Sequence, residues 1–251
     1  MEMKKIYILW LRQIKKTYRS RSRMVGSFFQ PLLYLIAMGY GFGSVFRQAG
    51  RGSYINFLVP GIVGMNILFT TMFSGMEVIW DRQFGFLKEM LVAPISRFNI
   101  MMAKTLGSAT IATTQGFIVM LVSLLLGFQL SRWAMLPAAV GVMFLVSLLF
   151  ASVSTMIASL LKDMHGFQSV MTFLIMPLFL LSGSIFPLQG LPKLLSFFTY
   201  VNPLSFGIDA LRQLLVGTSH FGLGIDLAVL GALTLVFLWL GSYFFKKVEV
   251  S

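Results

Sequence analysis

The sequence contains no cysteine and only two histidines among its 251 residues. Without cysteine, the chain has neither a disulfide framework nor thiol chemistry. The histidines, His165 and His220, lie far apart in the sequence. The topology inferred below places them on opposite sides of a membrane, which excludes a metal site that they share. We therefore expect this chain to bind no metal ion and no cofactor.

A phosphate loop is also missing. The sequence contains no G-x-x-x-x-G-K-[ST] pattern and no Gly-Lys dipeptide. The run Leu181-Ser182-Gly183-Ser184 superficially resembles the signature loop of an ATPase, but it lies inside an apolar segment and lacks the second glycine. We expect no enzymatic activity from the chain by itself. If ATP drives this protein, another polypeptide hydrolyses it.

Charged residues are scarce, at 11%, whereas hydrophobic residues make up 57% and the mean hydropathy is +0.84. Soluble domains contain about 25% charged residues, so this composition excludes an ordinary soluble protein. Long apolar runs predict helices, because within lipid only helices and closed barrels satisfy every backbone polar group. We expect an all-α integral membrane protein in which residues 1–251 form a single transmembrane domain.

Six apolar runs are long enough to cross a membrane. A hydrocarbon core of about 30 Å requires about 20 residues of helix. The expected spans are residues 24–46, 55–80, 99–127, 135–161, 167–186 and 223–245.

The net charge of +12 could suggest a nucleic-acid partner, but the placement of the basic residues favours a topology instead. With both termini in the cytoplasm, fifteen of the 20 Lys and Arg residues lie on the cytoplasmic side. The five on the outer side are Arg47, Arg51, Arg132, Lys193 and Arg212. This bias is what the positive-inside rule predicts. We expect a multi-pass protein of the cell (inner or plasma) membrane with cytoplasmic termini and no nucleic-acid partner.

Residues 3–20 predict an amphipathic helix before the first span. Its aromatic and apolar face consists of Met3, Tyr7, Trp10, Ile14 and Tyr18, and basic residues lie opposite. Such a helix suits the headgroup plane of a membrane. The alternative is an ordinary basic flank of the first span.

A short charged island, DRQFGFLKEMLVAPISR, separates the second and third spans at residues 81–97. Residues 82–93 predict a short amphipathic helix, in which Phe86 and Met90, like Leu87 and Leu91, are four residues apart on one face. Pro94 prevents the helix from continuing. The candidate contact residues are Phe84, Phe86, Leu87, Lys88, Glu89, Met90, Leu91 and Pro94. The helix either inserts into a partner protein or lies on lipid.

The connection at residues 187–222 is long and apolar. Pro192 and the pair Asn202-Pro203 divide it into two short helical segments. We expect two short helices that dip into the outer leaflet, buried in protein or lining a cavity, since irregular backbone is not exposed to lipid. The alternative is a surface loop that folds back.

Four ionisable residues near the ends of spans are candidate gate or helix-end residues. We expect Glu77 and Asp81 to pair with Arg82 or Lys104, with a gating contact to a partner as the alternative. Asp209 and Arg212 are three residues apart and are expected to pair with each other, and the pair could also help to close an outer gate.

These segments together resemble the permease subunits of type-2 ATP-binding-cassette exporters, in the branch of the daunorubicin-resistance-like permeases. The resemblance covers nearly the whole chain. It is carried by an E-x-L-x-A/T-P pattern at Glu89, Leu91 and Pro94, and more strongly by the Pro and Asn-Pro spacing from Ser182 to Arg212.

This resemblance implies that residues 82–93 form a coupling helix that docks into a separate nucleotide-binding ATPase subunit. It further implies a homodimer of this chain with two ATPase subunits, on which ATP and Mg would bind. Substrates that fit are amphipathic drugs, lipids or lipid-linked glycans. Two other classes stay open, an ion-coupled secondary transporter and a non-transporting membrane scaffold. An ion-coupled secondary transporter would need ionisable residues at mid-membrane. A non-transporting scaffold would have no need of the charged island at residues 81–97.

Overall fold

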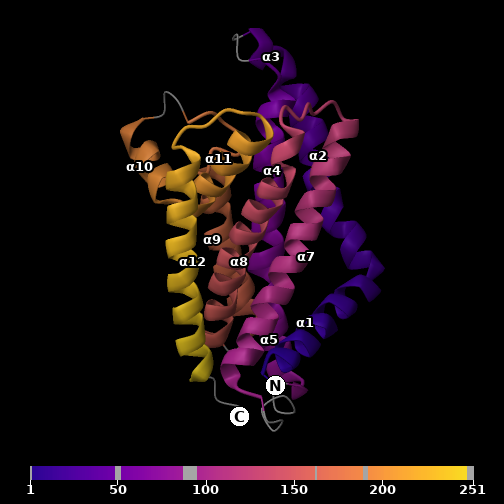
Figure 1. Cartoon of the computed structure of the whole chain (residues 1–251), viewed down its shortest axis with the longest axis vertical. Coiled ribbons are helices and arrows are strands. Elements are labelled where there is room, and N and C mark those ends of the chain that lie inside the picture. The colour runs from indigo at the N-terminus through magenta and orange to yellow at the C-terminus, as the bar shows by residue number, and fades with distance from the viewer. Residues whose placement is uncertain (1, 49–51, 87–94, 162, 189–191, 248–251) are drawn as a thin grey trace.

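The computed structural model of the chain describes residues 2–48, 52–86, 95–161, 163–188 and 192–247. Every regular element within these ranges is helical (Figure 1). The helices are α1 (Glu2–Arg19), α2 (Arg21–Gly41), α3 (Gly43–Gln48), α4 (Tyr54–Ser74), α5 (Met76–Gln83), α7 (Arg97–Leu125), the 3₁₀ helix η1 (Trp133–Met135), α8 (Leu136–Leu160), α9 (Met164–Leu180), α10 (Lys193–Val201), α11 (Pro203–Leu215) and α12 (Leu223–Lys246).

Four helical stretches are long and apolar enough to cross a membrane, namely Tyr54–Gln83, Arg97–Leu125, Trp133–Leu160 and Leu223–Lys246. They correspond to four of the six expected spans. The expected span 167–186 is a shorter apolar helix, α9, and is followed by a turn from residue 181. The expected span 24–46 is not one helix, because α2 ends at Gly41 and α3 begins at Gly43. The count of six spans therefore stays a prediction.

The helices place distant parts of the sequence at two opposite ends of the molecule (Figure 1). The start of α1, the end of α5 and the C-terminal end of α12 lie at one end, which we call the α5 end. Helices α3, α10 and α11 lie at the other, which we call the α11 end.

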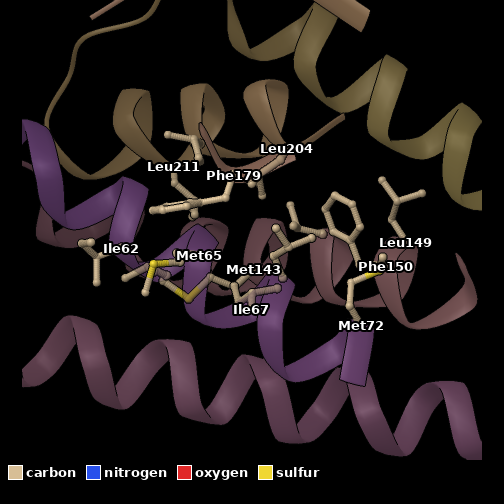
Figure 2. Close-up of a cluster of buried hydrophobic side chains, with 14 of the residues drawn as sticks. Ile62, Met65, Ile67, Met72, Met143, Leu149, Phe150, Phe179, Leu204 and Leu211 are labelled. Carbon is tan, nitrogen blue, oxygen red and sulfur yellow. The ribbon is translucent and has the colours of Figure 1, made fainter. Parts of the chain in front are cut away.

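The core surrounds α4, which packs against α2, α7, α8, α9 and α11. Figure 2 shows Ile62, Met65, Ile67 and Met72 of α4 facing buried side chains of α8, α9 and α11. Glycines bring the helices into close contact. A Cβ atom added to Gly64 would lie 2.8 Å from Ile208, and one added to Gly207 would lie 2.7 Å from Val146. Small residues allow such close approach in membrane bundles, where packing rather than hydrophobic burial joins helices.

The expected second span, 55–80, is interrupted at Gly75, between α4 and α5. Ser154 of α8 inserts its hydroxyl there, donating to the carbonyl of Met72 and accepting from the N–H of Gly75 at 3.0 Å. A Cβ atom at residue 75 would lie 2.4 Å from Ser154 Oγ, so only glycine fits. A side chain inserted into the backbone hydrogen-bond ladder is a known cause of helix kinks.

Two short helices, α10 and α11, occupy the long connection, and they meet at the Asn202-Pro203 pair. Asn202 caps α11 by accepting a hydrogen bond from the N–H of Leu204 at 3.0 Å, and its amide donates to the carbonyl of Leu178 at 2.7 Å. Pro203 occupies the first turn of α11, where its missing N–H costs nothing. That α10 and α11 dip into the outer leaflet of a membrane stays a prediction.

Candidate functional site

An ion pair joins α5 to α7 at the α5 end. The ammonium of Lys104 contacts the carboxylate of Asp81, and the two side chains are only 12% and 15% exposed. Lys104 is one of the two partners expected for Asp81. Both charges are largely removed from water, so loss of either partner would leave an uncompensated charge between α5 and α7.

Glu77, one turn earlier on α5, reaches a different partner. Its carboxylate lies 3.8 Å from the ammonium of Lys16 on α1. Arg82 instead donates to the carbonyl of Leu161 at 3.0 Å, just beyond the end of α8, and more weakly to that of Ser159. A cation at a helix C-terminus is favourable, because the last carbonyls are unpaired and the helix dipole is negative there. Helix α5 is thus connected to α1, α7 and α8.

Helix α1 packs on α7, as Gln13 and Thr17 are both buried. Trp10 Nε1 donates to Thr110 Oγ1 at 3.0 Å, and Gln13 Nε2 donates to Ser108 Oγ at 3.0 Å. Of the predicted aromatic face, Met3, Tyr7 and Tyr18 are exposed, and its contact with lipid stays a prediction. The contact with α7 thus combines Trp10, from the predicted aromatic face, with the polar residues Gln13 and Thr17, which the amphipathic pattern did not reveal.

Residues 87–93 of the expected coupling helix 82–93 lie outside the described residues, and so does Pro94. The candidate contact residues among them are Leu87, Lys88, Glu89, Met90 and Leu91. The start of this helix differs from the prediction, because α5 ends at Gln83 and Gly85 adopts a positive φ of 78°. Phe84 is 72% exposed and Phe86 is 45% exposed. Arg12 of α1 lies over the ring of Phe86 at 5.9 Å. The beginning of the island is therefore accessible and next to α1.

The expected ion pair between Asp209 and Arg212 does not form. The carboxylate of Asp209 accepts from Ser219 Oγ at 2.9 Å and from the N–H groups of His220 and Phe221, each at 2.8 Å, so it holds the loop before α12. The i, i+3 spacing favours an ion pair between Asp209 and Arg212, but the loop's hydroxyl and N–H donors already occupy the Asp209 carboxylate.

Arg212 also uses partners from other elements. Its Nη2 donates to the carbonyls of Phe57 at 3.2 Å and Gly183 at 3.1 Å, and the guanidinium lies 4.0 Å from the centroid of the Phe57 ring. Burial lowers the pKa of the guanidinium to about 10, with the nearby Asp209 opposing that shift, so Arg212 is charged at neutral pH. Arg212 thereby joins α11, α4 and the turn after α9. An outer-gate role for Asp209 and Arg212 stays a prediction.

Among the described residues, no group of three or more His, Asp or Glu side chains could hold a metal ion. The ion pairs and hydrogen bonds of α5 connect α1, α7 and the end of α8 through one short helix.

Comparison with known proteins identifies the family of the chain. Residues 4–216 match the family described as ABC-2 type transporter. The chain is 28% identical to the putative transport permease ycf38 of Cyanophora paradoxa, over 99% of this chain and 90% of the relative. It is also 26% identical to nodulation protein J of Rhizobium meliloti, over 89% and 86% of the two chains. A second nodulation protein J, from Rhizobium leguminosarum bv. trifolii, is 29% identical over 84% and 78%. The chain belongs to the ABC-2 type transporter family of membrane permeases.

Proposed function

We propose that this chain is the transmembrane permease subunit of an exporter that a separate ATPase subunit drives. Membership of the ABC-2 family, whose permeases work with an ATP-binding subunit, is the observation that carries the proposal. The sequence supports it, because it contains no phosphate loop of its own. On this proposal ATP and Mg bind to the ATPase subunit.

Residues 82–93 would couple the two subunits. The apolar positions 86, 87, 90 and 91 recur at the spacing with which amphipathic helices insert into a groove. The connections of α5 to α1, α7 and α8 support this role, since a push on the island would reach three helices at once. The proposed substrate is amphipathic or lipid-like, and it moves out of the cytoplasm or the inner leaflet.

The proposed topology puts both termini and the island in the cytoplasm. Ser53 precedes α4 at the α11 end, and Ser96 precedes α7 at the α5 end, and both are exposed. In this cysteine-free chain, Ser53→Cys should react with a membrane-impermeant maleimide from outside intact cells. Ser96→Cys should react only after permeabilisation. The reverse pattern would contradict the topology and the exporter proposal with it.

We further propose a homodimer that binds two ATPase subunits. One chain carries a single island, whereas a closed two-fold assembly would present one island to each of two ATPase subunits. Native mass spectrometry of the co-expressed subunits should give two copies of each. A complex of one permease with one ATPase would be incompatible with the paired assembly, and a second, different permease would replace the homodimer by a heterodimer.

A further inference from the structure

Three basic residues lie together at the α5 end, where α7 begins and α12 ends (Figure 1). Arg97, the first residue of α7, donates a hydrogen bond from Nη1 to the carbonyl of Lys246, the last residue of α12. Lys247 follows directly, and its ammonium lies 4.3 Å from the centroid of the Tyr243 ring. The side chains of Arg97, Lys246 and Lys247 are exposed. We call these three residues the basic cluster.

The positive charge of the basic cluster exceeds the negative charge around it. Neither Lys246 nor Lys247 forms an ion pair within the part of the chain that the structure describes. The acidic residues of α5 at the same end, Glu77 and Asp81, contact lysines of α1 and α7. Those two carboxylates are therefore already matched by other cations.

Two more carboxylates have to be counted, and they leave the excess of positive charge in place. Asp163 precedes α9 and accepts a hydrogen bond from the N–H of Gly166, and Lys162 stands next to it in the sequence. Glu249 follows Lys247 by two residues and lies outside the described residues. Even when both carboxylates are assigned to the basic cluster, its three cations and Lys162 outnumber them by two.

Next to the basic cluster, α12 presents an exposed apolar face. This helix is the least buried of the four long apolar stretches. Its exposed apolar and aromatic side chains share one face at spacings of three and four residues, and they are Leu235, Val236, Trp239 and Tyr243. The rings of Trp239 and Tyr243 are stacked, with their centroids 6.2 Å apart. The helix rises about 16 Å between Val236 and Lys247, which matches half of a hydrocarbon core of about 30 Å.

A phospholipid with an anionic headgroup fits both parts of this surface. Basic residues just beyond a membrane-spanning helix attract acidic lipids, each by about fivefold. Tryptophan and tyrosine rings suit the boundary between the headgroups and the acyl chains. A zwitterionic headgroup carries a cation of its own, so the excess positive charge gives it no comparable advantage. A free anion such as phosphate has no acyl chain to cover the face of α12.

We propose that the basic cluster and the apolar face of α12 bind an anionic phospholipid, with its headgroup at the cluster and an acyl chain along Val236 and Trp239. The topology proposed above assigns this lipid to the cytoplasmic leaflet. This site goes beyond the proposed function, because the lipid stays on the outside of the bundle and is not the exported molecule. Since the cluster takes residues from two helices, the bound headgroup bridges the start of α7 and the end of α12.

Quenching by spin-labelled lipids tests this site. In the cysteine-free chain, Val236→Cys is labelled with the fluorophore nitrobenzoxadiazole, since Val236 is 49% exposed and lies at acyl-chain depth from the basic cluster. The full chain is reconstituted in phosphatidylcholine vesicles. Part of the lipid is then replaced by phosphatidylglycerol, or by phosphatidylcholine as the reference, that carries a nitroxide at the middle of one acyl chain. Because a nitroxide quenches only at close range, the two titrations give the relative affinity of each lipid for this face.

We expect the relative affinity of phosphatidylglycerol to exceed that of phosphatidylcholine by at least about fivefold, the factor that one basic residue near an acidic headgroup provides. Equal relative affinities would overturn the proposal. Absence of quenching by both lipids would also overturn it, since protein rather than lipid would then cover this face of α12.

Two double variants with the same loss of charge separate the site from a general attraction. Lys246→Gln/Lys247→Gln removes two cations of the basic cluster, whereas Lys4→Gln/Lys15→Gln removes two exposed cations of α1. The first should lower the preference for phosphatidylglycerol to less than about twofold, because the remaining cations then equal the two carboxylates, and the second should retain it.

Loss of the preference in both double variants would show that the net charge of the protein attracts the lipid, and loss in neither would show that the lipid binds elsewhere. Either result would overturn the proposal. These measurements use the permease alone, so their failure would leave the proposed coupling to an ATPase untouched.

Discussion

The substitution Met90→Asp is expected to abolish co-purification of the ATPase subunit while the permease stays inserted and folded. Met90 belongs to the apolar face of the island that the sequence pattern defines. Burying one such side chain in a partner contributes roughly 1.5–3 kcal/mol, and a carboxylate there would lose at least that much. Leu87→Asp should have the same effect. Pull-down of the tagged permease measures binding, and substrate-stimulated ATP hydrolysis, which should also be lost, measures coupling.

Lys88→Ala is the matched control for this prediction. Lys88 lies on the opposite face of the same predicted helix, so its loss should change binding far less. A monodisperse gel-filtration profile in detergent shows that each variant is folded. Unchanged ATPase binding by Met90→Asp would mean that the island lies on lipid, and the coupling role would then belong to another segment.

Asp81→Leu should destabilise the permease strongly, by about 3–5 kcal/mol, the usual cost of removing one partner from a buried ion pair. The substitution leaves the Lys104 ammonium, 12% exposed, without its carboxylate. The thermal unfolding temperature of the purified permease in detergent measures the change, and it should fall by several degrees or more.

The double variant Asp81→Leu/Lys104→Met separates charge from packing. Replacing a buried pair by apolar residues of similar size is often neutral or stabilising, so the double variant should recover most of the lost stability. An Asp81→Leu variant as stable as the wild type would show that the ion pair does not hold α5 to α7. A double variant as unstable as the single one would show that shape, not charge, matters at this position.

Some parts of this fold could be predicted closely from the sequence. The apolar runs 135–161 and 223–245 match α8 and α12 within a few residues, because hydrophobic length alone defines such helices. The Asn202-Pro203 pair predicted the junction of α10 and α11, since a side-chain cap and a first-turn proline are local signals. These features depend on residues close together in the chain.

Features that depend on distant residues could not be predicted. The interruption at Gly75 coincides with the hydroxyl of Ser154 of α8, which the sequence of α4 and α5 does not indicate. The expected Asp209–Arg212 pair does not form for the same reason. Asp209 accepts a hydrogen bond from Ser219, and Arg212 donates one to the carbonyl of Gly183, and both partners belong to other segments. The pair of Asp81 and Lys104 was among the expected alternatives, but only the structure chooses between Lys104 and Arg82.

The most direct test of coupling is site-specific photocrosslinking from the island. The cysteine-free chain allows a benzophenone maleimide to be attached at Met90→Cys, with Ser53→Cys, just before α4 at the α11 end, as the control. The proposed docking predicts a light-dependent crosslink between the permease and the ATPase subunit from Met90→Cys and none from Ser53→Cys. A crosslink to lipid alone from Met90→Cys, in membranes that contain both subunits, would contradict the central claim that this island couples the permease to its ATPase.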